Sequence, residues 1–212
     1  MTTGPALLLA TAVSASIATI VADLKECFVP ARIFRPTAMA AIILLAAARP
    51  AATSGSYRLF ITAGLAASLV GDVFMMLPKK KFAAGLVAFF VAHCFYATAF
   101  LRAGTARVEI TTALPFLLCA FFMMRTLYPR LGALKAPVTL YILAMTAMAV
   151  LAAQRYITAG GAPAFSAFAG AMIFIASDVI LSVNRFLKKI PLAQLYILGT
   201  YFTAQILFAL SV

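Results

Sequence analysis

The chain has 212 residues, of which 65% are hydrophobic and only 10% are charged. Soluble domains are about 45–50% apolar and about 25% charged, so this composition excludes a soluble globular protein and indicates an integral membrane protein. The net charge is +12, but no basic tract is interleaved with aromatic residues, so we expect the bilayer and its anionic headgroups as partners and no nucleic acid.

Apolar runs separated by charged residues predict eight transmembrane helices, because the length of each run is close to that of a helix crossing a bilayer core, which is about 20 residues. In chain order the predicted spans are 5–22, 34–50, 57–77, 82–102, 108–127, 134–154, 163–183 and 191–211. The first run lacks the positively charged start of a secretory signal, so we interpret it as a membrane helix. The sequence therefore predicts an all-α fold, a single transmembrane helical domain over residues 1–212.

The distribution of Lys and Arg predicts the orientation of the bundle. Twelve of the 17 Lys and Arg residues lie in the first, third, fifth and seventh loops. By the positive-inside rule these loops are cytoplasmic and both termini lie outside. We expect a multi-pass protein of the inner or plasma membrane if the source is bacterial. No pattern in the sequence specifies an oligomeric state.

A weak internal repeat relates the two halves of the chain. Asp72 and Asp178 are 106 residues apart, and at the same offset Gly64 aligns with Gly170. The third and seventh spans would then cross the membrane in the same direction. This pattern suggests two parallel four-helix repeats.

Two of the five acidic residues lie inside predicted spans. Asp23, Glu26 and Glu109 are at helix ends, where water can solvate them, but Asp72 and Asp178 are not. A carboxylate deep in a membrane costs about 2.5–3.5 kcal/mol on insertion scales and is by default a functional candidate. The structural alternative is a hydrogen bond or ion pair between helices.

Each intramembrane aspartate precedes a cation by seven residues. Lys79 follows Asp72 and Arg185 follows Asp178, so each cation lies about two helical turns, or about 10 Å, nearer the membrane surface. This arrangement fits an amphiphile. The candidates for binding its headgroup are Lys79, Asn184 and Arg185, with the aspartates placed to act on the first bonds of its chain.

Five further polar side chains within the predicted spans could line the same cavity or hold water. They are His93, Tyr96, Tyr141, Tyr201 and Gln205. Each could instead be a hydrogen bond that joins helices. With one histidine and three scattered cysteines, the chain offers no metal-ligand cluster and no disulfide framework, so we expect no metal and no cofactor.

The sequence resembles the YhhN-like family, whose animal members are lysoplasmalogenases. The resemblance covers essentially the whole chain and its eight-helix count. The matching segments are Gly71-Asp72, FAAGLVAFFVAHCFY at 82–96, SDVILSVNRF at 177–186 and TYFTAQIL at 200–207. One difference is at the start of the second helix, where the family often has Lys-Pro and this chain has Arg35-Pro36.

The resemblance implies hydrolysis of the vinyl ether bond of a lysoplasmalogen, lysoplasmenyl-ethanolamine or -choline, to a fatty aldehyde and a glycerophospho-alcohol. This reaction needs a protonated acid and an anion near the developing oxocarbenium ion, roles that two buried carboxyls can divide. Our hypothesis is that Asp72 and Asp178 face each other and perform acid/base catalysis. Because Asp178 lies near Arg185, it would more readily stay ionised, which favours Asp72 as the acid.

Two other classes of protein fit parts of the sequence. Acids within parallel four-helix repeats are also typical of a proton-coupled transporter or a lipid translocator, which would move its substrate without a chemical product. A non-catalytic lipid-binding protein would use the aspartates only to join helices. In that protein, replacing either aspartate would mainly change stability.

Overall fold

The computed structural model describes residues 3–49, 54–77, 81–104 and 107–212. Among these the chain forms eight α-helices and no strand. The helices are α1 (Thr3–Leu24), α2 (Phe28–Ala48), α3 (Gly55–Met76), α4 (Phe82–Ala103), α5 (Ile110–Leu127), α6 (Lys135–Ala159), α7 (Gly161–Ser182) and α8 (Ala193–Leu210). Short 3₁₀ turns over Tyr128–Arg130 and Gly132–Leu134 lead into α6, and a π-helical turn over Val183–Leu187 follows α7. All eight predicted spans are confirmed as helices long and apolar enough to cross a membrane.

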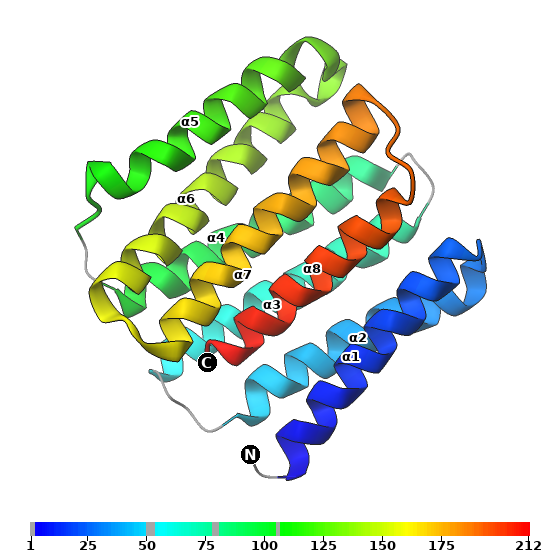
Figure 1. Ribbon diagram of the computed structural model, residues 1–212, viewed down its shortest axis with the longest axis horizontal. Helices are drawn as coiled ribbons and strands as arrows, with labels where there is room; N and C mark the ends of the chain where they lie inside the picture. The colour runs from blue at the N-terminus through cyan, green and yellow to red at the C-terminus, as the bar shows by residue number, and fades with distance from the viewer. Residues whose placement is uncertain (1–2, 50–53, 78–80, 105–106) are drawn as a thin grey trace.

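Six of the helices form a closed ring. The other two, α1 and α5, pack outside it and lie at opposite edges of the bundle in Figure 1. The ring runs through α2, α3, α4, α6, α7 and α8. Helix α1 packs on α2 and α8, and α5 packs on α6. The packing of the two halves corresponds, because α4 contacts α6 as α8 contacts α2.

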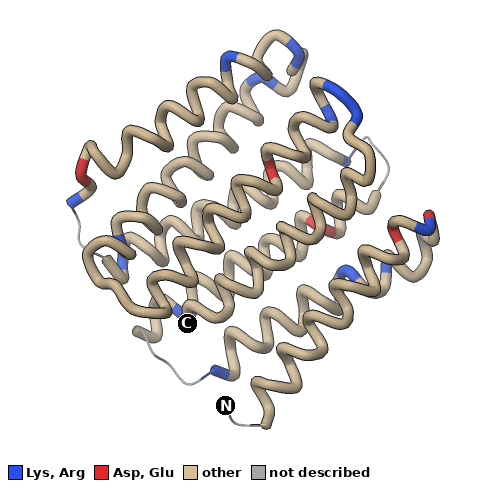
Figure 2. The backbone as a smooth tube through the Cα atoms, in the orientation of Figure 1, with Lys and Arg blue, Asp and Glu red and all other residues tan. Residues whose placement is uncertain are grey.

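The two ends of the bundle differ in charge. Figure 1 shows both termini at one end, and Figure 2 shows Lys and Arg gathered mainly at the other. That second end, called here the cation-rich end, holds the end of α3, the start of α4 and the α1–α2, α5–α6 and α7–α8 connections. Its position on the cytoplasmic side of the membrane remains a prediction of the positive-inside rule.

Glycine allows close contact between α3 and α4. A Cβ at Gly71 would lie 2.7 Å from Cε2 of Phe89, and a Cβ at Gly64 would clash with the ring of Tyr96. Small residues are favoured where membrane helices approach each other, since van der Waals packing drives their association. The glycines therefore bring the aromatic face of α4 against α3, beside Asp72.

Two helices extend well beyond their predicted bounds, and each holds a buried arginine near that end. Helix α2 begins at Phe28 rather than at 34, and Arg35 in its second turn pairs with Asp23 of α1 at 2.9 Å. Helix α6 continues to Ala159 rather than ending at 154. There Arg155 donates to Tyr57 Oη at 2.8 Å, and Gln154 Oε1 accepts the N–H of Glu109 at 3.1 Å.

Candidate functional site

A cavity of about 240 Å³ opens inside the ring near the cation-rich end. Its walls come from the last turns of α3 and α7 and the first turns of α4, α6 and α8. Most of the lining side chains are apolar. The polar ones are Arg35, Asp72, Tyr141, Ser177, Asp178, Ser182, Arg185, Gln194 and Tyr201. Both intramembrane aspartates therefore lie at one cavity, each contributed by a different half of the chain.

Asp72 is held by a tyrosine from the last helix. The hydroxyl of Tyr201 donates to Asp72 Oδ2 at 2.6 Å, and Asp72 is only 3% exposed. A hydrogen bond from a hydroxyl compensates part of the solvation that a buried carboxylate loses. The bond also ties α8 to α3 at the depth of the cavity.

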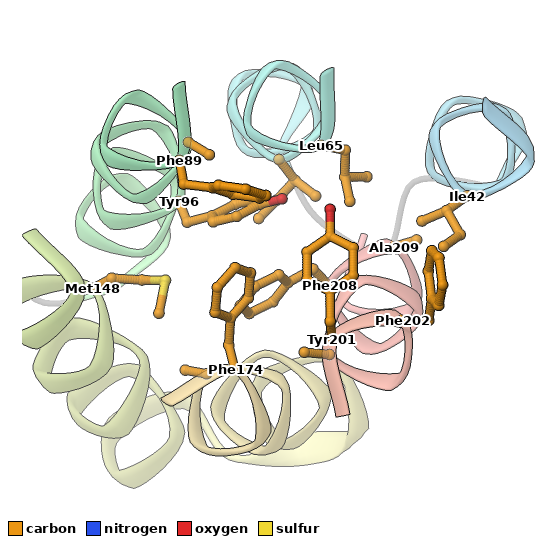
Figure 3. Close-up of a cluster of buried hydrophobic side chains, with 14 of the residues drawn as sticks. Ile42, Leu65, Phe89, Tyr96, Met148, Phe174, Tyr201, Phe202, Phe208 and Ala209 are labelled. Carbon is orange, nitrogen blue, oxygen red and sulfur yellow. The ribbon is translucent and has the colours of Figure 1, made fainter. Parts of the chain in front are cut away.

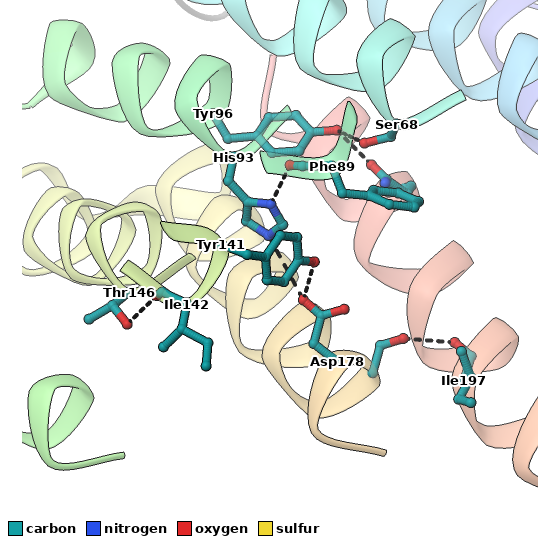
Figure 4. A network of polar contacts seen from close by, with 11 residues as sticks. Ser68, Phe89, His93, Tyr96, Tyr141, Ile142, Thr146, Asp178 and Ile197 are labelled. Atoms are coloured by element: carbon teal, nitrogen blue, oxygen red, sulfur yellow. Dashed lines mark hydrogen bonds and ion pairs between the residues drawn. The ribbon is translucent and has the colours of Figure 1, made fainter. Parts of the chain in front are cut away.

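Asp178 has a tyrosine partner of its own and a histidine nearby (Figure 4). Tyr141 of α6 donates to Asp178 Oδ2 at 2.6 Å. His93 Nε2 lies 4.0 Å from the same oxygen, which is too long for a hydrogen bond. Since His93 Nδ1 is 2.6 Å from the Phe89 carbonyl, which can only accept, Nδ1 carries a proton. In a neutral ring Nε2 therefore presents its lone pair toward Asp178.

An aromatic layer closes the deep end of the cavity. Phe89, Phe174 and Tyr201 are the lining residues farthest from the cation-rich end on α4, α7 and α8. Their ring centroids are 5.8–6.5 Å apart in near-perpendicular pairs, a favourable packing for aromatic rings. Figure 3 shows the rings converging from the three helices. We call Phe89, Phe174 and Tyr201 the aromatic floor.

Tyr96 and Gln205 lie beyond this floor and do not line the cavity. Tyr96 Oη donates to Gln205 Oε1 at 2.7 Å and lies 3.3 Å from Ser68 Oγ. The three residues join α4, α8 and α3 through buried hydrogen bonds. His93 is also buried behind the lining residues. The structure thus gives Tyr96 and Gln205 the joining role that was the alternative to lining the cavity.

Two arginines line the cavity on the side of the cation-rich end. The Arg185 guanidinium is 3.5 Å from the centroid of the Phe82 ring, a cation–π contact. It makes no ion pair with Asp178 among the described residues, so the reason for expecting an ionised Asp178 is wrong. Arg35 lines the same cavity. It stands where the family often has Lys, so a cation is kept at this position.

Of the other two predicted headgroup residues, Asn184 does not line the cavity. Asn184 Oδ1 accepts the backbone N–H of Ile190 at 2.9 Å and so fixes the α7–α8 connection. Lys79 lies outside the described residues. The π-helical turn that contains Asn184 and Arg185 is a feature that is frequent at functional sites.

Sequence reasoning assigned no site role to several lining residues. Arg35, Ser177, Ser182 and Gln194 line the cavity, and Ser177 Oγ donates to the Ile197 carbonyl at 2.9 Å. A signal for Arg35 was present, since it is a cation inside what proved to be α2. Ser182 also had one, since it lies one helical turn after Asp178 on the stripe that leads to Arg185. Ser177 gave none, because a serine within an apolar helix commonly bonds to backbone.

Comparisons with known proteins relate the chain to one family of membrane proteins. Residues 31–212 match the YhhN family. The human lysoplasmalogenase TMEM86A is 34% identical over 77% of this chain and 67% of its own length. Human TMEM86B, also called a lysoplasmalogenase, is 33% identical over 74% of this chain and 65% of its own length. An uncharacterized membrane protein YhhN of Escherichia coli is 26% identical over 84% and 85%.

No solved structure matches the chain. This chain spans about two thirds of the length of the human relatives. With eight helices of membrane-spanning length and these relatives, it is a multi-pass integral membrane protein.

Proposed function

Since this chain belongs to the YhhN family, we propose that it hydrolyses the vinyl ether bond of lysoplasmalogens, as the names of its human relatives state for them. The observation that carries the proposal is the placement of two buried aspartates, each hydrogen-bonded to a tyrosine, at one mainly apolar cavity. Buried ionisable residues in a membrane are costly and mark functional sites. The substrate class would be a lysophospholipid with ethanolamine or choline in its headgroup.

The reaction adds water across the vinyl ether. A proton goes to the β-carbon, which makes the carbon attached to oxygen an oxocarbenium ion. Water adds to that carbon and loses a proton, and the hemiacetal then breaks its bond to the glycerol oxygen, which leaves protonated. The products are a fatty aldehyde and a glycerophospho-alcohol, and no oxidant or reductant is consumed.

Asp72 and Asp178 divide the proton transfers in this proposal. One carboxyl is protonated and delivers its proton to the β-carbon, while the other is ionised, stabilises the cation and accepts a proton from water. Glycosidases use a pair of carboxyls for a similar oxocarbenium-like transition state. Tyr141 and Tyr201 orient the carboxyls through their 2.6 Å hydrogen bonds, and His93 can exchange a proton with Asp178 after a small movement.

The cations on the open side of the cavity bind the headgroup phosphate in this proposal. Arg185 lies seven residues after Asp178 and lines the same cavity, about 10 Å nearer the membrane surface along an ideal helix. Arg35 lines it from α2. Guanidinium groups suit a phosphate because they donate paired hydrogen bonds in a fixed geometry. A phosphate held there would place the first bonds of the lipid chain near the aspartates.

The test is aldehyde release by the purified protein in detergent. Lysoplasmenyl-ethanolamine is the substrate, and the saturated alkyl-ether analogue and an ester lysolipid are run in parallel. The proposal expects aldehyde from the vinyl ether and no product from the other two. Fatty acid released from the ester, with no aldehyde from the vinyl ether, would identify a lysophospholipase. No product from any of the three would contradict a hydrolase and would direct the next assay to lipid transport in sealed vesicles.

A further inference from the structure

A second hollow of about 440 Å³ lies between α5 and α7 on the outside of the ring. We call it the α5–α7 groove, and the residues that define it are Cys119, Phe122, Met123, Val179, Ser182 and Val183. Helix α5 packs against α6, and most of its length is exposed, including Phe122 at 61% and Leu117 at 47%. In a membrane this groove faces lipid chains.

The groove adjoins the cavity. Met123 of α5 and Ser182 of α7 line both hollows, so these two side chains form the boundary between them. Met123 is flexible and can change rotamer at little cost. Only these two side chains therefore separate the groove from the cavity that holds the aspartates.

The cavity alone is too small for a membrane lipid. Its volume of about 240 Å³ is below the about 300–1,000 Å³ of sites that bury most of a drug-sized ligand. Phe174 of the aromatic floor is four residues from Asp178, so only about 6 Å of depth remains below that aspartate. A lipid chain reaches across half of a hydrocarbon core about 30 Å thick. A chain whose first bonds lie at the aspartates cannot continue downward and has to leave sideways.

We propose that the α5–α7 groove binds the hydrocarbon chain of a single-chain amphiphile whose polar end occupies the cavity. It is also the route by which the amphiphile passes between the bilayer and the cavity. The apolar groove fits a hydrocarbon chain, and the arginines of the cavity fit an anionic headgroup. The identity of the reacting bond rests on the proposed function, but binding in the groove requires no reaction.

Photo-crosslinking tests the binding. The probe is a saturated alkyl-ether lysolipid, which lacks the vinyl ether, with a diazirine near the end of its chain, bound to the full-length protein in detergent. Cross-links are located by mass spectrometry. The expected result is labelling concentrated on 119–127 and 179–187, reduced by an excess of the unmodified alkyl-ether lysolipid. Labelling spread evenly over lipid-facing residues such as Leu117, or not reduced by the competitor, would overturn the proposal.

A matched pair of variants tests the route. Cys119→Trp fills the groove, whereas Leu117→Trp places the same ring on the opposite face of α5, outside both hollows. The readout is the ratio of kcat/KM for a long-chain over a short-chain lysoplasmenyl-ethanolamine. Cys119→Trp should lower this ratio about tenfold, a change of about 1.4 kcal/mol, and Leu117→Trp should leave it unchanged. If the long-chain over short-chain ratio of kcat/KM is the same in both variants, the groove is not the route of the chain.

The two failures are distinguishable. If the wild-type protein releases no aldehyde from either chain length, the proposed function is wrong, and the cross-linking result alone decides whether the groove binds a chain. If the wild type is active but the probe labels the lipid-facing surface evenly, the groove proposal is wrong and the proposed function stands.

Discussion

The two buried carboxyls are tolerated at the residue scale because each receives a short hydrogen bond. Tyr201 donates to Asp72 and Tyr141 to Asp178, both at 2.6 Å. A hydrogen bond contributes about 0.5–1.5 kcal/mol to a neutral group and about 1.5–3 kcal/mol to a charged one, which offsets part of the insertion cost of about 2.5–3.5 kcal/mol. The tyrosines come from α8 and α6, so assembly of the ring completes both sites.

Replacing either aspartate tests its catalytic role. Asp72→Asn and Asp178→Asn keep the shape of the side chain but remove the acidic proton and the charge. We expect each to lower kcat for aldehyde release about 100-fold or more, because a positioned acid or base contributes about 10²–10⁴-fold. Glu109→Gln, at the exposed start of α5, is the matched control. A folded aspartate variant with most of the wild-type rate would disprove the assigned roles.

The tyrosine hydroxyls should matter less than the carboxyls. Tyr141→Phe and Tyr201→Phe each remove one hydrogen bond to an aspartate. We expect up to about a tenfold fall in kcat where the aspartate is protonated, because a neutral hydrogen bond contributes about 0.5–1.5 kcal/mol, and a larger fall where it is ionised. Tyr156→Phe, whose ring stacks on Phe168 away from the cavity, should leave kcat unchanged. Steady-state assays of the three purified variants decide the point, and an effect of Tyr156→Phe equal to the others would argue against a specific role.

At the scale of elements, the close contact between α3 and α4 positions Phe89 of the aromatic floor. Gly71→Ala would place a methyl group 2.7 Å from the Phe89 ring, so α3 and α4 would have to separate or Phe89 would have to turn. We expect a lower Tm in detergent, corresponding to an overpacking cost of about 1–3 kcal/mol. Gly199→Ala on α8 is the control, because nothing lies within 4 Å of its added Cβ. A Tm at or above the wild-type value for Gly71→Ala would contradict the packing.

The helices were predictable from the sequence because lipid imposes a simple pattern on it. Runs of about 20 apolar residues have to be helical in a bilayer, where no water satisfies the backbone. The bounds failed where a cation was taken as a boundary, since Arg32 lies inside α2 and Arg155 inside α6. Arg155 donates to Tyr57, and Arg35 donates to Asp23 of the preceding helix. These partners are far enough along the chain that no local pattern reveals them.

The candidate site was predictable only in part. The cost of buried acids identified Asp72 and Asp178, and their shared cavity follows from their similar depth. Sequence depth alone could not separate Tyr141 and Tyr201, which hydrogen-bond to the aspartates, from Tyr96, which lies below the floor. The rotation of a helix around its axis decides that difference, and an almost uniformly apolar helix carries little information about its rotation.

The whole molecule combines a pseudo-symmetric arrangement of helices with an asymmetric site. Gly64 and Gly170 occupy equivalent places, each facing an aromatic ring of the following helix, Tyr96 and Phe208. The aspartates do not share this equivalence. Asp72 bonds to a tyrosine of the other half, and Asp178 bonds to one of its own half. Different surroundings for two carboxyls are what a division into acid and base requires.

The orientation of the bundle can be measured with a native cysteine. Cys27 is exposed at the α1–α2 connection of the cation-rich end, which the positive-inside rule places in the cytoplasm. In a Cys94→Ala, Cys119→Ala background, Cys27 should react with a membrane-impermeant maleimide only after cells are permeabilised. Arg107→Cys in the α4–α5 connection, with Cys27 also replaced by Ala, should react in intact cells. The reverse pattern would invert the orientation.

The measurement that tests the central claim most directly is the isotope content of the aldehyde formed in heavy water. The purified protein converts lysoplasmenyl-ethanolamine while a coupled reductase traps the aldehyde as the alcohol, and unlabelled aldehyde added separately measures background exchange. Protonation of the β-carbon predicts a single deuterium on the carbon next to the former aldehyde carbon. Product without deuterium at that carbon would contradict the acid-catalysed mechanism and the role given to the aspartate pair.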